Sequence, residues 1–168
     1  MNPVQPIEFF ASGEPKGQPR ARAFAMKRGD KTLVRMYDPA TAEGWKNQIA
    51  TAARPFILAT PPLGPVSLCL YFNFPRPKSH FRSNGTLRPN APNWHTSKPD
   101  IDNCTKAVMD ALKTLGFFKD DSQVCEKQVT KVYFANPGCS VSIDYMPVYE
   151  MPSAAVEKRK AKEMELAL

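Results

Sequence analysis

The segment 65–74 constrains the fold most, because its apolar side chains recur at every second position. Val66, Leu68, Leu70, Phe72 and Phe74 alternate there with other residues. Successive side chains of a β-strand point to opposite faces of a sheet, so this pattern predicts a strand with one buried face. Other elements of the fold have to cover that face.

The segment 101–115 predicts a helix that can cover it. Its apolar positions share one face when successive residues are spaced about 100° apart. They are Ile101, Cys104, Val108, Leu112 and Leu115. Asp100 is a suitable N-cap for this helix, and Gly116 is a suitable end.

A second helix is expected over about residues 40–53, with Asp38 or Thr41 as its cap. Trp45 and Ile49 recur at helical spacing together with the alanines at 52 and 53, and Pro55 ends the segment.

Strands are also expected at residues 7–11, 33–37, 124–134 and 140–145, the last two turning at Asn136-Pro-Gly. Residues 14–31 and 75–99 are expected to be basic loops. The predicted fold is α+β, a two-layer arrangement of a mixed sheet of four or five strands with two main helices. It occupies residues 1–150, and residues 151–168 form a charged tail that is helical or frayed.

Composition excludes several classes of protein. No apolar run approaches the roughly 20 residues of a membrane helix, and the N-terminus lacks the pattern of a secretory signal. We therefore expect a cytoplasmic protein with no membrane contact. The four cysteines form no C-x-x-C pair, so we expect reduced, mostly buried thiols.

Charge is distributed unevenly around a net value of +7. Residues 15–99 carry 14 Lys or Arg against three Asp or Glu, whereas residues 100–168 carry nine against 11. A basic half joined to an acidic cluster suits a protein that binds a polyanion and holds cations where it acts. A basic surface with no such partner is the alternative.

Acidic residues gather around the predicted helix 101–115. Asp102 and Lys106 are one helical turn apart on the face opposite the apolar side. Asp120 and Asp121 precede the strand that follows, which could return them towards the helix start. Neighbouring carboxylates repel unless they are protonated or bind a cation, and oxygen ligands suit Mg²⁺ or Mn²⁺. A simpler interpretation is an ion pair between Asp102 and Lys106.

Other ligand motifs are excluded. An EF-hand loop that began at Asp100 would place Cys104, Thr105 and Ala111 where it requires an oxygen ligand, Gly and Glu. Residues 14–20 lack the ending of a P-loop, and we expect no small organic cofactor.

The run from Lys98 to Val124 resembles the RusA family of Holliday junction resolvases. That family shows D-x-D-N-x-x-K-x-x-x-D-A-L, a short spacer and then D-D-x-Q-V. This chain has Asp100-Ile-Asp-Asn-Cys-Thr-Lys-Ala-Val-Met-Asp-Ala-Leu and then Asp120-Asp-Ser-Gln-Val. The close match covers about residues 97–134.

The resemblance implies a homodimer that introduces paired nicks at four-way DNA junctions with Mg²⁺ or Mn²⁺. By position, Asp100, Asp102 and Asp121 match the catalytic metal-binding carboxylates. Lys106 matches the essential lysine, and Asp120 matches a neighbouring acid that is a further candidate ligand.

Basic residues of the two loops are candidate DNA phosphate contacts. They are Arg20, Arg22, Arg76, Lys78, Arg82, Arg88 and Lys98. Phe81 and Trp94 either stack on bases or pack the loop onto the core, and we favour packing. His80 and His95 lie outside the family motif, and we expect neither to bind metal.

Two alternatives remain open. The first is a nuclease of the same chemistry that prefers flaps, forks or replication intermediates. The second is a non-catalytic DNA-binding protein, although DNA binding alone gives no reason to gather carboxylates.

Overall fold

The computed structural model describes residues 5–19, 22–28, 31–37, 42–60 and 62–147, with the backbone alone for 22–28 and 31–37. Arg20, the side chain of Arg22, the proposed caps Asp38 and Thr41, and the tail 151–168 therefore lie outside the description. The strands are β1 (Ile7–Ser12), β2 (Arg22–Arg28), β3 (Lys31–Tyr37), β4 (Val66–Phe74), β5 (Val124–Tyr133) and β6 (Gly138–Tyr145). The main helices are α1 (Glu43–Ala53) and α2 (Ile101–Thr114), and the short 3-10 helices are η1 (Arg54–Phe56), η2 (Lys78–His80) and η3 (Asp121–Gln123).

Four strands form one mixed sheet in the order β1-β6-β4-β5. β6 runs antiparallel to β1 and to β4, whereas β5 runs parallel to β4. The fold is α+β with two main helices, as predicted. The chain turns between β5 and β6 at the expected place, but β4 lies between these strands, so they are not a hairpin.

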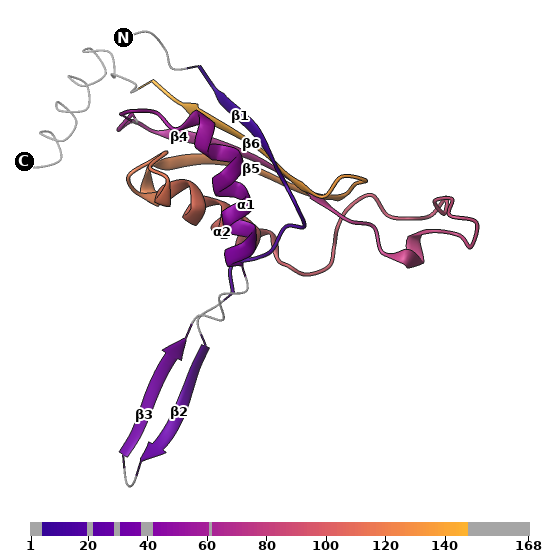
Figure 1. Cartoon of the computed structure of the whole chain (residues 1–168), viewed down its shortest axis with the longest axis horizontal. Coiled ribbons are helices and arrows are strands. Elements are labelled where there is room, and N and C mark those ends of the chain that lie inside the picture. The colour runs from indigo at the N-terminus through magenta and orange to yellow at the C-terminus, as the bar shows by residue number, and fades with distance from the viewer. Residues whose placement is uncertain (1–4, 20–21, 29–30, 38–41, 61, 148–168) are drawn as a thin grey trace, which may run out of the picture.

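The other two strands form a separate hairpin, in which Arg22 to Arg28 pair with Tyr37 to Lys31. The strand expected at 33–37 is confirmed and extends from Lys31. The prediction of a loop through residue 31 is wrong, because residues 22–28 are a strand. In Figure 1 this hairpin extends away from the sheet and the helices.

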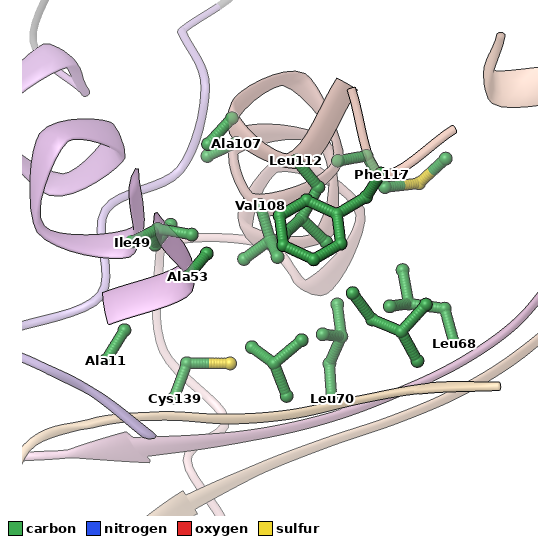
Figure 2. Close-up of a cluster of buried hydrophobic side chains, with 14 of the residues drawn as sticks. Ala11, Ile49, Ala53, Leu68, Leu70, Ala107, Val108, Leu112, Phe117 and Cys139 are labelled. Atoms are coloured by element: carbon green, nitrogen blue, oxygen red, sulfur yellow. The ribbon is translucent and has the colours of Figure 1, made fainter. Parts of the chain in front are cut away.

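Both main helices pack on the same face of the sheet, and the core lies between the two layers (Figure 2). All five alternating residues of β4 are buried, as the pattern at 65–74 predicted. Cys104, Val108 and Leu112 cover them from α2, and Ile49 and Ala53 from α1. Cys69 and Tyr71, on the opposite face of β4, are exposed, so the helices cover only one face.

Helix α2 has nearly its predicted bounds, and Gly116 follows it with a φ of +80°, which favours glycine. α1 begins later than predicted, with Ala42 at its N-cap and no side-chain cap. Cys104 and Cys139 are buried, but Cys69 and Cys125 are exposed, so the prediction of mostly buried thiols holds for half of them. Within the described residues, no helix has the length and apolar character to cross a membrane.

Candidate active site

The start of α2 is held in place from β5. The ammonium group of Lys131 donates to the carbonyl oxygens of Ser97 at 2.9 Å and Pro99 at 2.6 Å. Asp100 follows at the predicted N-cap position, and its backbone carbonyl accepts from the N–H of Cys104 at 3.1 Å. Its side chain caps nothing. The carboxylate of Asp100 therefore makes no capping hydrogen bond to the helix that follows it.

A cleft of about 530 Å³ lies between α2 and β5. α2 supplies Asp102 and Lys106, η3 supplies Asp121, and β5 supplies Lys127. The remaining lining residues are Ile101, Thr105, Met109 and Val129. Three of the four residues predicted as catalytic thus line one cleft.

Asp100, the fourth residue, lines a different hollow of about 710 Å³. The segment 14–19 forms its other side, with Glu14 and Lys16 among its lining residues. This segment is fixed to α2 by the backbone N–H of Gln18, which donates to the carbonyl of Asn103 at 2.8 Å. Asp100 and Asp102 therefore line separate hollows beside the first turn of α2.

The two charged groups that α2 contributes to the cleft have no partner within the described part of the chain. Neither Asp102 nor Lys106 forms an ion pair or a side-chain hydrogen bond there, and both residues are exposed. The interpretation of these residues as a simple ion pair along the helix is therefore wrong.

The turn at η3 uses the carboxylate of Asp120 instead. This carboxylate caps η3 by accepting from the backbone N–H of Ser122 at 3.0 Å, and it also accepts from the Lys113 ammonium at 3.2 Å. The hydrogen bond from Ser122 and then the contact with Lys113 lower the pKa of Asp120 to about 2. Lys113 also lies 3.6 Å from a carboxylate oxygen of Asp121, which links the two acids.

Gln123 fixes the same turn on both sides. Its side-chain oxygen accepts from the backbone N–H groups of Lys119 at 2.7 Å and Asp120 at 3.3 Å. Its side-chain nitrogen donates to the carbonyls of Pro62 at 3.4 Å and Gly64 at 3.1 Å. Most of the D-D-x-Q-V motif thus stabilises the turn that places Asp121 in the cleft.

The turn before η3 is also tied to the sheet. The phenol of Tyr145 on β6 donates to the carbonyl of Phe117 at 2.8 Å. Burial raises the pKa of this phenol, which keeps the donor protonated.

The donor chemistry of the cleft fits a hard divalent cation. No group of three His, Cys, Asp or Glu residues converges to hold a metal ion among the residues that the structure describes. Mg²⁺, however, is commonly held by one or two carboxylates together with water and substrate phosphates. Asp102 and Asp121 supply two carboxylates in a cleft open to solvent.

Several predicted DNA contacts have partners in the protein. Arg76 donates to the carbonyl of Pro92 at 2.7 Å and to the side-chain oxygen of Asn93 at 3.0 Å. Arg88 donates to the carbonyl of Phe81 at 3.1 Å. These two arginines therefore hold the loop 75–99 together. Three other candidates remain exposed, and they are Lys78, Arg82 and Lys98.

The loop 75–99 is anchored by aromatic residues. His95 is buried, with its ring 3.9 Å from that of Phe74 and 4.8 Å from that of Tyr133. His80 meets Tyr133 edge-on at 4.7 Å. Both histidines thus pack in the protein.

Trp94 is 65% exposed, so the prediction that it packs onto the core is wrong. Phe81 is half-buried.

Sequence reasoning missed Lys127 and Lys131. Each is a single lysine within a strand, which by itself predicts only a solvated side chain. The pairing of β5 with β4, on the sheet that α2 covers, places Lys127 in the cleft and Lys131 beside the chain that leads into α2.

Comparison with known proteins gives two matches. The family model described as endodeoxyribonuclease RusA matches residues 12–144. The uncharacterized protein YqaN of Bacillus subtilis (strain 168) is 38% identical over 148 residues, covering 82% of this chain and 94% of that protein. The family match includes β2 to β5, β6 up to its last residue but one, both main helices and the whole cleft. The chain belongs to the RusA family of endodeoxyribonucleases, which act on DNA.

Proposed function

We propose that this chain resolves four-way DNA junctions by paired symmetric nicks, as a Mg²⁺-dependent homodimer that acts in DNA recombination and repair in the cytoplasm. The family to which it belongs comprises nucleases of branched DNA that are typically dimeric. The observation that carries the proposal is the cleft lined by Asp102, Lys106 and Asp121. Mn²⁺ is expected to substitute for Mg²⁺, since both prefer oxygen ligands.

The proposed roles follow from side-chain chemistry. Asp102 and Asp121 hold the divalent ion, and Asp100 is a further ligand beside the same helical turn. Asp120 supports Asp121 through Lys113, which contacts both acids. A bound divalent ion would supply Lewis acidity, lowering the pKa of a coordinated water and offsetting phosphate charge. Lys106 contributes a fixed positive charge beside the phosphate.

The proposed reaction is hydrolysis of a phosphodiester. The oxygen of water forms a bond to phosphorus, and the bond between phosphorus and the 3′ oxygen breaks. The departing 3′ oxygen takes up a proton, and the water loses one to solvent. The products are a 5′-phosphate and a 3′-hydroxyl. The homodimer is proposed because the family is typically dimeric, and two clefts related by a twofold axis suit two symmetric nicks.

The test is cleavage of a synthetic four-way junction, with a linear duplex, a flap and a fork of matched sequence as controls. Each DNA is incubated with the wild-type protein in Mg²⁺, Mn²⁺ or a chelator. Asp102→Asn and Asp121→Asn are assayed beside it, and product ends are mapped. We expect metal-dependent, symmetric nicks in the junction, and losses of roughly 100-fold or more in either variant.

Other outcomes separate the alternatives. If the protein cut the flap or fork in preference, the proposed substrate would change to that branched DNA, and the proposed catalytic site would stay the same. Binding of the junction without cleavage in either metal would indicate a non-catalytic DNA-binding protein. Wild-type cleavage rates in Asp121→Asn would remove this carboxylate from the metal site.

A further inference from the structure

We propose that Lys127 binds a backbone phosphate of the DNA strand in the cleft, across from Lys106. This inference rests on the proposed function, because it requires a DNA strand in that cleft. Position 127 lies outside the sequence motif described above, which ends at Val124. Lys127 would therefore add a substrate contact to those that the motif supplies.

The register of the sheet brings Lys127 to the cleft. Lys127 pairs with Leu68 and Val129 pairs with Leu70, and both leucines are buried beneath the helices. Paired residues on neighbouring strands point to the same face, so Lys127 projects to the helix side. β5 is the edge of the four-stranded sheet, and there Lys127 and Val129 line the cleft that α2 closes on its other side.

Two nearby lysines are engaged by the fold, whereas Lys127 is not. The ammonium of Lys113 lies 3.2 Å from Asp120 and 3.6 Å from Asp121, and that of Lys131 donates to two loop carbonyls. Lys127 is exposed and forms no ion pair or side-chain hydrogen bond with any described residue. Its charge is therefore available to a ligand.

The balance of charge in the cleft favours an anionic ligand at this position. Lys106 and Lys127 share the cleft with the carboxylates of Asp102 and Asp121. When a divalent cation offsets the two carboxylates, the two ammonium groups remain on the walls of one cleft without a counter-charge, and like charges repel. A phosphodiester carries a single negative charge. The scissile phosphate beside Lys106 would balance one ammonium group, and a neighbouring phosphate of the same strand would balance the other.

The experiment compares Lys127→Gln and Lys127→Arg with a matched control, Lys119→Gln. Lys119 is also exposed, lies close in sequence and does not line the cleft. Binding of the synthetic four-way junction is measured over a series of salt concentrations with Ca²⁺ in place of Mg²⁺, so that a divalent cation still offsets the two carboxylates. Only samples in which the DNA stays uncut are compared. Cutting in Mg²⁺ and thermal unfolding are measured on the same samples.

We expect Lys127→Gln to weaken binding about threefold to tenfold at low salt and to reduce the slope of log affinity against log salt by about one. Lys127→Arg keeps the charge and should retain most of the affinity and the slope. Lys119→Gln should leave both unchanged, and no variant should change the Tm.

Wild-type affinity and slope in Lys127→Gln would overturn the assignment of Lys127, and junction cutting by the same protein would leave the proposed function intact. Equal losses in Lys127→Gln and Lys119→Gln would also overturn it, because general charge would then explain binding. A wild-type protein that cuts no branched DNA in Mg²⁺ would overturn the proposed function, and this inference with it.

Discussion

Two of the elements that line the cleft, α2 and η3, use their polar side chains differently. On the α2 side, Asp102 and Lys106 are exposed and have no partner among the described residues. On the η3 side, Asp120 and Gln123 are hydrogen-bonded to the backbone, and a lysine contacts the acids. One side leaves its charges for a ligand, whereas the other uses most of its polar groups to build a turn.

Asp120 and Asp121, the two neighbouring acids of the D-D-x-Q-V motif, have different roles for this reason. Asp120 and Asp121 are adjacent in the chain, yet only Asp121 lines the cleft. Asp120 caps η3 and pairs with Lys113. Asp120 accepts a backbone hydrogen bond and stabilises the turn, whereas Asp121 makes a longer contact with Lys113, at 3.6 Å, and its carboxylate lines the cleft, where it can bind a ligand.

The largest expected effect comes from replacing the two adjacent acids separately. Asp121→Asn should reduce Mg²⁺-dependent cleavage by roughly 100-fold or more and leave the Tm nearly unchanged, since its carboxylate serves the ligand. Asp120→Ala should lower the Tm, because an N-cap and an ion pair are lost, and should reduce cleavage much less. Cleavage rates and thermal unfolding are measured in parallel. Equal losses of cleavage in both variants would contradict the separation of roles.

Local patterns in the sequence predicted that Asp102, Lys106 and Asp121 lie near one another, and these three residues line one cleft in the structure. Helical spacing places Asp102 and Lys106 opposite the apolar side of α2, and in the structure Val108 and Leu112 on that side are fully buried. Asp121 reaches the cleft because Gly116 ends the helix and the chain turns back through η3. These features depend on residues within about one or two turns of each other, which sequence periodicity captures.

The arrangement of the strands could not be predicted in the same way. A turn at Asn136-Pro-Gly suggests a hairpin, but β6 pairs with β4 and β1 instead. The choice of partner depends on which faces bury apolar side chains together across the whole sheet. β2 was missed because Arg22 to Arg28 contain alanine and basic residues, which have weak strand propensity. The position of Lys127 depends on strand pairing and could not be inferred either.

The next largest effect should come from Gln123→Ala, which tests whether the turn itself matters. The variant would leave two backbone N–H groups and the carbonyls of Pro62 and Gly64 without the partners observed here. Lost hydrogen bonds of this kind should cost about 2 kcal/mol in unfolding free energy, lowering the Tm by about 4 to 8 °C. Cleavage should then require more Mg²⁺, because Asp121 is held less firmly. An unchanged Tm would mean that the turn forms without Gln123.

Lys131→Met should have a smaller effect, and it tests the other end of the site. The variant removes the donors to the carbonyls of Ser97 and Pro99, which hold the chain before Asp100. We expect a loss of about 1 kcal/mol in unfolding free energy, because both carbonyls can turn to water. Denaturant unfolding measures this loss. Lys119→Met is the control and should be neutral. A cleavage defect without loss of stability would instead assign Lys131 to the DNA.

The smallest expected effect concerns pH and the anchor of the loop 75–99. Burial, and then the charge of Lys131, lower the pKa of His95 from its ordinary value of 6.5. The unfolded chain therefore binds a proton at a higher pH than the folded chain does. The contribution of neutral His95 to stability is complete above pH 6.5 and declines as the pH falls from there through the lowered pKa.

His95→Phe keeps an aromatic ring against Phe74, where the present stacking distance is 3.9 Å, and removes the titration. The difference in Tm between about pH 8 and about pH 5.5 should therefore be smaller in this variant than in the wild type. Thermal unfolding at both pH values provides the measurement. An equal difference in the two proteins would assign the pH dependence to other groups. His95 would then stabilise the fold only through the packing of its ring between the loop and the sheet, and not through its titration.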